Sequence, residues 1–422
     1  MTSIRPAVTH STTTTTLPLA GVKVLDLSRI LAAPMAAQTL GDLGADVIKV
    51  ERPVTGDEAR RWGPPFLKDR DGKDTRESPM YLCANRNKRS ITVDISKPEG
   101  QRLVRQLAAI SDVLIENYKV GDLARYGLDY AGIGEVNPRI VYCSITGFGQ
   151  TGPYSAQPGY DSVFQAMSGL MSVTGLPDGV PGGVPMKTGP SLADYMASQA
   201  ATTAIVAALY GRDARQGRGQ HIDISLLDST IAAQSHYMAT YLATGVVPQR
   251  RGTEGNGGVP SQAFPCADRP IVVICGSEAQ FRRFCEVLGQ PMLAEDERFS
   301  SNARRLAHRP ELAQTFGRLT STWPSAALLE ALELAGIPCG PINSYPEVFA
   351  DPHVQHRQMT VKVEHIQAGP VELCGSPIRY VGLAPRASMA PPVLGQHTQE
   401  ILSTELGLTG EEILKLQEAQ VI

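Results

Sequence analysis

The sequence lacks the patterns that mark a membrane span, a disulfide framework or a nucleic-acid partner. No apolar run reaches the roughly 18–20 residues that a membrane-spanning helix needs. The seven cysteines among 422 residues are scattered and contain no CxxC pair, so neither a disulfide framework nor a zinc site is expected. A formal net charge of -3 gives no electrostatic footprint for nucleic acid or an anionic membrane. These features favour an enzyme of the reducing cytoplasm.

Common nucleotide and hydrolase motifs are also missing. There is no P-loop, no GxSxG elbow and no HExxH motif. Residues 28–34 follow the first predicted strand and read SRILAAP, without the glycines of a dinucleotide fingerprint. Nicotinamide or flavin binding through that loop is therefore not expected.

What is present is a regular alternation of strand and helix patterns. We predict strands at 22–28, 45–51, 112–118 and 139–147, and helices at 32–44 and 99–110. This spacing is typical of an α/β fold, a Rossmann-like parallel sheet with helices on both faces. Residues 1–18 form a threonine-rich tail that we predict to be disordered. Between about 230 and 325 the sequence pattern differs from that of the preceding region.

One acidic residue stands out in an alanine-rich helix. Asp194 is the only charged residue between Thr188 and Leu209, and it lies in the first turn. An aspartate there can simply stabilise the helix dipole, by about 0.3–1 kcal/mol. It can also be a nucleophile in a dry setting. The residues alone leave both interpretations open.

Several stretches in chain order resemble the family III CoA-transferases. They are GVKVLDLSRILAAP (21–34), LGDLGADVIKVERP (40–53), GDEARRWGPPF (56–66), NRNKRSITVDI (85–95), ENYKVGDLARYGL (116–128), GFGQTGPYSAQPGYDSVFQAMSGLMSVTG (147–175), GIPCGPINS (336–344) and LGQHT (394–398). Within that family the chain is most similar to succinyl-CoA:glutarate-type enzymes. The resemblance implies CoA transfer from an acyl-CoA, with succinyl-CoA as the expected donor, to a small dicarboxylic acid. No cofactor is implied, because the coenzyme A thioester is itself a substrate.

The resemblance implies that Asp194 is the covalent nucleophile. Its carboxylate would attack the thioester carbonyl to form a mixed anhydride, and the released thiolate would then form an aspartyl-CoA thioester. Asp161 matches a position that carries a glutamate in formyl-CoA:oxalate enzymes. It would orient a substrate or, equally, form a turn after Pro-Gly.

The resemblance also implies a set of CoA-binding positions. They are Ile30, Leu31 and Ala32 in the pantetheine loop, Arg52, Val93, Ser96, Asn117, Tyr118 and Arg125 toward the nucleotide, Tyr160 near the thiol, and Gly257 and Gly258 in a mobile loop. Tyr160 has an alternative interpretation as a core aromatic residue, and the glycines as a plain turn. Lys97 is a candidate to replace a lysine that formyl-CoA enzymes have at position 96. For the distal carboxylate of the acid, the candidates are Arg60, Arg61, Arg86 and Arg89.

The family fold implies a large domain built from both chain ends, 19–229 and 326–422, with an inserted α+β domain at 230–325. It also implies an interlocked homodimer. The same-fold alternative is an α-methylacyl-CoA racemase-like isomerase, and a third hypothesis is a non-catalytic acyl-CoA-binding protein. Racemases have histidine where this chain has Tyr160, and a tyrosine of pKa near 10 is poorly matched to α-proton exchange at neutral pH.

Overall fold

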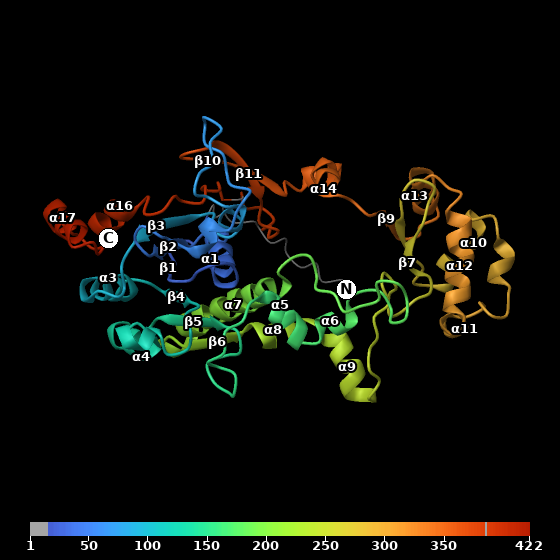
Figure 1. Cartoon of the computed structure of the whole chain (residues 1–422), viewed down its shortest axis with the longest axis horizontal. Coiled ribbons are helices and arrows are strands. Elements are labelled where there is room, and N and C mark those ends of the chain that lie inside the picture. Colours follow the sequence, from blue (N-terminus) through green and yellow to red (C-terminus); the bar gives the residue numbers. More distant parts are fainter. Residues whose placement is uncertain (1–15, 385) are drawn as a thin grey trace, which may run out of the picture. The chain divides into compact units, whose positions relative to one another are not determined.

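The computed structural model describes residues 16–384 and 386–422, in two compact units (Figure 1). Unit 1 comprises the described parts of Met1–Leu170, Lys187–Val246 and His356–Ile422, and unit 2 comprises Met171–Met186 and Val247–Gln355. Residues 1–15 of the tail predicted to be disordered lie outside the described residues. Leu17 already belongs to a turn, because its carbonyl accepts a hydrogen bond from Ala20 N at 3.0 Å.

The boundaries of the two units differ from the predicted domain boundaries at 229 and 325, because a helix and a strand pairing continue past those positions. Helix α8 (Leu226–Ala233) runs through the first predicted boundary, so unit 1 continues to Val246. Strand β9 (Cys339–Pro341) pairs with β8 (Ile271–Ile274), so unit 2 extends past 325. Residues 171–186 join unit 2 because Gly252 N donates to Gly175 O at 2.9 Å.

The centre of unit 1 is a six-stranded parallel sheet, as the alternation predicted. Its strand order is β3-β2-β1-β4-β5-β6, the doubly wound order. The strands are β1 (Lys23–Asp26), β2 (Asp46–Glu51), β3 (Lys88–Thr92), β4 (Val113–Glu116), β5 (Val141–Thr146) and β6 (His221–Ser225). Strand β3 is not among the strands predicted from the sequence.

Successive strand residues enter two different hydrophobic cores. Val24 packs with helices α1 (Ala32–Asp42) and α7 (Leu192–Gly211), while its neighbour Leu25 packs with α3 (Pro98–Ala109) on the other face. The second face is completed by α4 (Tyr130–Val136), α16 (Thr398–Thr404) and α17 (Gly410–Glu418). The alanines of α1 and α7 allow these two helices to pack closely over β1, β4 and β5.

The strand order places a topological switch point between β1 and β4. The chain leaves β1 toward β2 and leaves β4 toward β5, so the loops after these strands diverge and open a crevice at their carboxyl ends. Residues 27–31 follow β1 and residues 117–122 follow β4. A ligand site is therefore expected beside these two loops.

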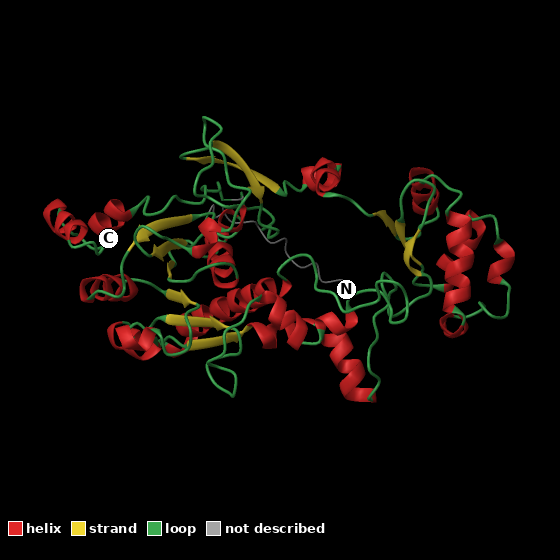
Figure 2. Ribbon diagram, viewed as in Figure 1, coloured by secondary structure: helices red, strands yellow, loops and turns green. Residues whose placement is uncertain are grey.

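Further elements complete both units (Figure 2). Unit 1 also contains α2 (Pro79–Leu82), α5 (Asp161–Met167), α9 (Ser235–Thr244), 3-10 helices at Glu58–Arg61 and Leu123–Tyr126, a π-helix at Arg212–Gln216, and the hairpin of β10 (Thr360–His365) and β11 (Gly369–Cys374). Unit 2 is an α+β unit with an antiparallel sheet of β7 (Ser261–Phe264), β8 and β9, packed with α10 (Glu278–Val287), α12 (Arg309–Thr320) and α13 (Ser325–Leu334). Shorter helices are α11 (Asn302–Ala307), α14 (Tyr345–Ala350) and a 3-10 turn at Pro291–Ala294, while α6 (Leu170–Val173) and α15 (Pro352–His356) lie at the unit boundaries.

Candidate active site

Asp194 lies in the first turn of α7, but another carboxylate binds the start of that helix. The N-cap residue is Ser191, and the backbone N–H of Ala193 donates to Asp161 Oδ1 at 2.9 Å. Asp161 Oδ2 accepts a second hydrogen bond from Gln165 Nε2 at 2.7 Å. Asp161 therefore stabilises the helix N-terminus in the way that the simplest interpretation had assigned to Asp194.

The Asp194 carboxylate borders a cavity of about 760 Å³ at the carboxyl ends of the sheet strands. The pKa of Asp194 is raised to about 7, chiefly by burial and also by the nearby Asp161, while the backbone N–H of Ala32 acts to lower it. A carboxyl group with this pKa is poorly hydrated and is still mainly ionised just above neutral pH. These are the properties that a carboxylate nucleophile requires.

Seven of the predicted site residues line this cavity together with Asp194. They are Ile30, Leu31, Ala32, Asn117, Tyr118, Tyr160 and Asp161. The Tyr160 side chain is 62% exposed, which contradicts its alternative interpretation as a core aromatic residue. The loops after β1 and β4 thus meet the N-terminus of α7 at the switch point.

The remaining predicted CoA contacts of unit 1 line a second cavity of about 600 Å³. It is bordered by Arg52, Val93, Ser96, Tyr118 and Arg125. The two cavities adjoin, because Arg29, Glu58 and Tyr118 line both. Such a continuous surface suits a long ligand with a charged end and a reactive end. Lys97 is not among its lining residues, since its ammonium donates to the main-chain carbonyls of Ala419 and Gln420.

The arginines predicted for the distal carboxylate are mostly committed elsewhere. Arg60 is buried against Glu51 and Glu77, at 2.7 and 2.6 Å. Arg86 is paired with Asp42, and Arg89 with Asp46, Glu400 and Glu405. Arg61 borders the second cavity only, away from Asp194.

The cations that do line the Asp194 cavity are different ones. They are Arg29, Lys119 and Lys187. These three residues were not predicted, because nothing in their local sequence patterns distinguishes them from solvated surface charges. Lys187 precedes α7 by a few residues, and that proximity was the one available signal.

Gly257 and Gly258 belong to unit 2 and line neither cavity. A Cβ atom on Gly258 would lie 2.6 Å from the carbonyl oxygen of Cys275, so this glycine is required for close backbone packing. A Cβ atom on Gly257 would meet nothing within 4 Å. Their predicted role as a mobile loop over the active site stays a prediction.

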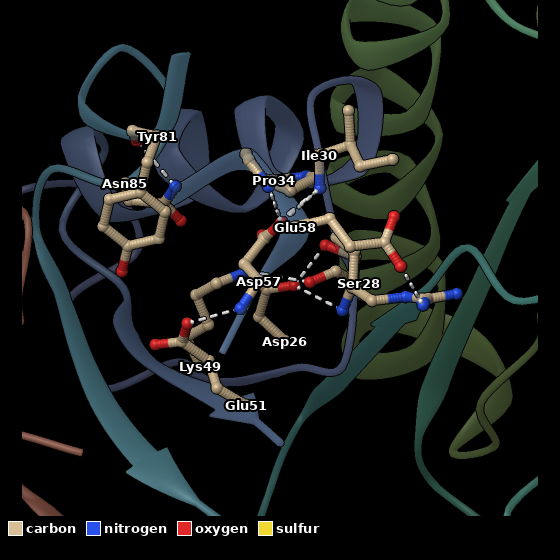
Figure 3. A network of polar contacts seen from close by, with 12 residues as sticks. Asp26, Ser28, Ile30, Pro34, Lys49, Glu51, Asp57, Glu58, Tyr81 and Asn85 are labelled. Carbon is tan, nitrogen blue, oxygen red and sulfur yellow. Dashed lines mark hydrogen bonds and ion pairs between the residues drawn. The ribbon is translucent and has the colours of Figure 1, made fainter. Parts of the chain in front are cut away.

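A buried network of charged side chains surrounds the loop after β1 (Figure 3). Lys49 Nζ lies 2.9 Å from Asp57 Oδ2, and both side chains are at most 1% exposed. Lys88 Nζ lies 2.8 Å from Asp26 Oδ2, with both side chains fully buried. Burial opposes the charge on Lys49, but Asp57, Asp26 and Glu51 outweigh it and hold the pKa of Lys49 above its usual value. The same balance keeps the pKa of Asp57 below its usual value, chiefly through Lys49 and two backbone N–H groups.

The described ranges offer neither a metal site nor a membrane-spanning helix. Residues 16–384 and 386–422 contain no group of three or more His, Cys, Asp or Glu residues arranged to hold a metal ion. Within the same ranges, no helix combines the length and the apolar character of a membrane span.

The fold and the crevice define a doubly wound α/β protein with a partly buried aspartate at its switch point. The family model described as CoA-transferase family III matches residues 19–398. The chain belongs to this family and is a CoA-transferase.

Known relatives agree with this assignment. The chain is 44% identical over 386 residues to the succinate–glutarate CoA-transferase of Agrobacterium fabrum, covering 92% of this chain and 95% of that protein. It is 42% identical over 410 residues to the human succinyl-CoA:glutarate CoA-transferase, covering 96% and 90%. The crystal structure of a CaiB/BaiF family protein from Brucella suis matches with a TM-score of 0.83 and 41% identity, over 92% of this chain and 100% of that one.

Proposed function

We propose that this enzyme transfers CoA from succinyl-CoA to a small dicarboxylic acid such as glutarate, with Asp194 as the covalent nucleophile. The observation that carries the proposal is the Asp194 carboxylate itself. It borders the larger cavity and has a pKa raised to about 7, chiefly by burial, while a different carboxylate, that of Asp161, binds the N-terminus of its helix. The names of the relatives support the substrate class.

The proposed chemistry exchanges one thioester for another and needs no external energy source. Asp194 attacks the succinyl thioester carbonyl, the C–S bond breaks, and CoA leaves as a thiolate. The thiolate then attacks the aspartyl carbonyl of the mixed anhydride and expels succinate, leaving an aspartyl-CoA thioester. The acceptor carboxylate attacks that thioester, the C–S bond breaks, and CoA thiolate departs, leaving an aspartyl–acceptor anhydride. The thiolate then attacks the acceptor carbonyl of this anhydride, which forms the new acyl-CoA and releases the Asp194 carboxylate. Poor hydration of Asp194 favours the first attack.

We infer that Lys187 holds the distal carboxylate of the acid. Its ammonium lies at the Asp194 cavity and donates to the main-chain carbonyls of Thr188 and Gly189, each at 3.2 Å. The described ion pairs give neither Lys187 nor Lys119 an acidic partner, whereas Arg29 is already paired with Glu58; Lys187 is preferred because it lies just before α7, the helix that carries Asp194. A cation without a carboxylate partner is the better anchor for an incoming one.

We carry three further predictions from the sequence as proposals alongside this function. The enzyme acts as an interlocked homodimer, the glycine loop of unit 2 moves during turnover, and the protein works in the cytoplasm. The first is tested by light scattering of the purified protein, where a monomer mass would reject it.

The test of the function is a reaction in D2O with succinyl-CoA and a panel of acids, including glutarate, malate, itaconate and oxalate. Mass spectrometry of the CoA esters should show a new acyl-CoA with wild-type enzyme and with Asp228→Asn, but none with Asp194→Asn. Asp228 is the matched control, because it also lies in the first turn of a helix, α8, but does not line the cavity.

Two outcomes would reject the proposal. Deuterium at the α-carbon without a new thioester would favour the racemase-like isomerase. Tight binding of succinyl-CoA with no reaction would favour the acyl-CoA-binding protein. Hydroxylamine adds a direct check, because it converts an activated Asp194 carboxyl group into a hydroxamate that peptide mass spectrometry can locate.

A further inference from the structure

The loop between β1 and α1 has a conformation that its own sequence does not favour. Ile30 has φ +70°, in the left-handed region, although it is a β-branched residue. Such residues avoid this region, and they stay there only where surrounding contacts over-determine the backbone. Ile30 and its neighbours line the Asp194 cavity, so the unfavourable conformation lies at the proposed reaction centre.

Buried side chains bind the main chain of this loop from several sides (Figure 3). Ile30 N donates to both Asp57 carboxylate oxygens, at 3.0 and 3.2 Å. Lys49 Nζ donates to Ser28 O at 2.8 Å, and Ser28 N donates to Asp26 Oδ1 at 2.9 Å. Lys49 and Asp57 also bind each other, so a single ion pair fixes the loop at two points, residues 28 and 30.

Further side chains bind the main chain in the middle of the same loop and in the first turn of α1. Asn117 Oδ1 accepts from Arg29 N at 2.8 Å, and Asn117 Nδ2 donates to Arg29 O at 2.7 Å. Lys88 Nζ donates to Pro34 O at 2.9 Å, inside the first turn of α1. The loop therefore enters α1 in a fixed orientation, with Ala32 as the first helical residue.

We propose that the buried Lys49–Asp57 pair is a positioning device for catalysis, which holds residues 28–32 so that the Ala32 N–H faces the Asp194 carboxylate. This inference rests on the proposed function of Asp194. Neither Asp57 nor Lys49 lines the Asp194 cavity, although Asp57 borders the second one; toward Asp194 they act through the backbone of Ile30 and Ser28. Buried ion pairs add little net stability compared with apolar residues, so a geometric role accounts better for a pair with these contacts.

The consequence is a defined effect on the titration of Asp194. The Ala32 N–H lowers the pKa of Asp194, against burial and Asp161, which raise it. Releasing the loop removes that contact and raises the pKa of Asp194 further. The other titratable or charged groups that line the same cavity are Arg29, Glu58, Tyr118, Lys119, Tyr160, Asp161 and Lys187, and none of them is altered by the variants below.

The experiment compares Asp57→Ser with Glu77→Gln in the full-length enzyme. Serine at 57 can still accept from Ala59 N and cap the following 3-10 helix, as Asp57 does, but it cannot hold Ile30 N and Lys49 together. Glu77 is equally buried in the connected network, yet its carboxylate binds Arg60 and not the loop. Glu77→Gln therefore reports the general effect of disturbing buried charges. Asp57→Asn, which keeps the side-chain volume, is the second variant if Asp57→Ser does not fold.

We expect Asp57→Ser to lower kcat/KM by about 10–100-fold, because small displacements of reacting groups have effects of this size. The acidic limb of the plot of kcat/KM against pH, which reports the ionisation of Asp194, should move to higher pH. Glu77→Gln should leave the limb in place. In an Ile30→Gly background, where positive φ is easily adopted, the loss caused by Asp57→Ser should shrink. Equal losses in both variants, or an unmoved limb, would overturn the proposal.

Hydrogen exchange separates this inference from the proposed function. In unliganded enzyme, Asp57→Ser should speed amide exchange of the peptide 27–35, while Glu77→Gln should not. If the wild type makes no new acyl-CoA, the proposed function fails, and unchanged exchange would then reject the positioning of the loop as well. If the wild type transfers CoA and the Asp57→Ser limb stays in place, only the positioning inference fails.

Discussion

Replacing Asp194 with asparagine should remove activity and at the same time stabilise the folded protein above neutral pH. The folded state raises the pKa of this carboxyl group from 3.8 to about 7, mainly by burial. Above pH 7 the folded enzyme therefore holds a poorly hydrated charge that the unfolded chain accommodates in water. Asparagine has nearly the same shape and no charge, so it removes this cost.

The magnitude follows from proton linkage. Between the unfolded and folded pKa values the folded state binds more protons, so the contribution of Asp194 to stability is full below pH 3.8 and is lost as pH rises to about 7. Between about pH 5 and pH 8 the loss spans two pKa units, or about 2.7 kcal/mol at about 1.36 kcal/mol per unit. Partial exposure of the side chain to solvent reduces this figure, and we expect about 1–2 kcal/mol.

The assay is urea unfolding of wild type and Asp194→Asn at these two pH values. The chain has two tryptophans, Trp62 in unit 1 and Trp323 in unit 2, so a Trp323→Phe background makes fluorescence report on the unit that contains Asp194. Only the difference between the two proteins is used, because other buried carboxyl groups titrate equally in both. A difference that is the same at both pH values would refute the reasoning, since Asp194 would then ionise as an ordinary aspartate.

Three further predictions concern activity. Wild-type kcat/KM should fall about tenfold per pH unit below an acidic limb near pH 7, because only ionised Asp194 attacks; a limb near pH 4 in a pH–rate profile would contradict this. Asp161→Asn should move that limb to lower pH by removing the like charge and should also lower kcat, because Ala193 N and Gln165 lose their carboxylate partner; an unmoved limb would show that Asp161 does not act on Asp194. Lys187→Met should raise KM for glutarate by about tenfold or more while leaving KM for monocarboxylate acceptors nearly unchanged. Equal effects on the two KM values would reject the role of Lys187 in holding the distal carboxylate.

The predicted fold was largely right because hydrophobic periodicity is a local signal. Strands β1, β2, β4 and β5 are rich in valine, isoleucine and leucine, as is typical of strands covered on both faces. Strand β3 was missed because it reads KRSIT, and its polar side chains Lys88 and Ser90 are buried with partners that include Asp26 and Glu51. The two C-terminal helices, α16 and α17, are separated where Gly407 adopts φ +67°.

The sequence by itself determined the alternating α/β architecture, the family and the residues gathered at the crevice, Asp194 among them. Only the tertiary structure decided which carboxylate binds the N-terminus of α7 and which cations remain available at the cavity. Arg60 illustrates why: its guanidinium donates to Glu77 and to Pro392 O, 17 and 332 residues away along the chain. Backbone preferences depend on near neighbours and can be read along the chain, whereas the ionisation and role of a side chain depend on groups that only folding brings within a few ångströms.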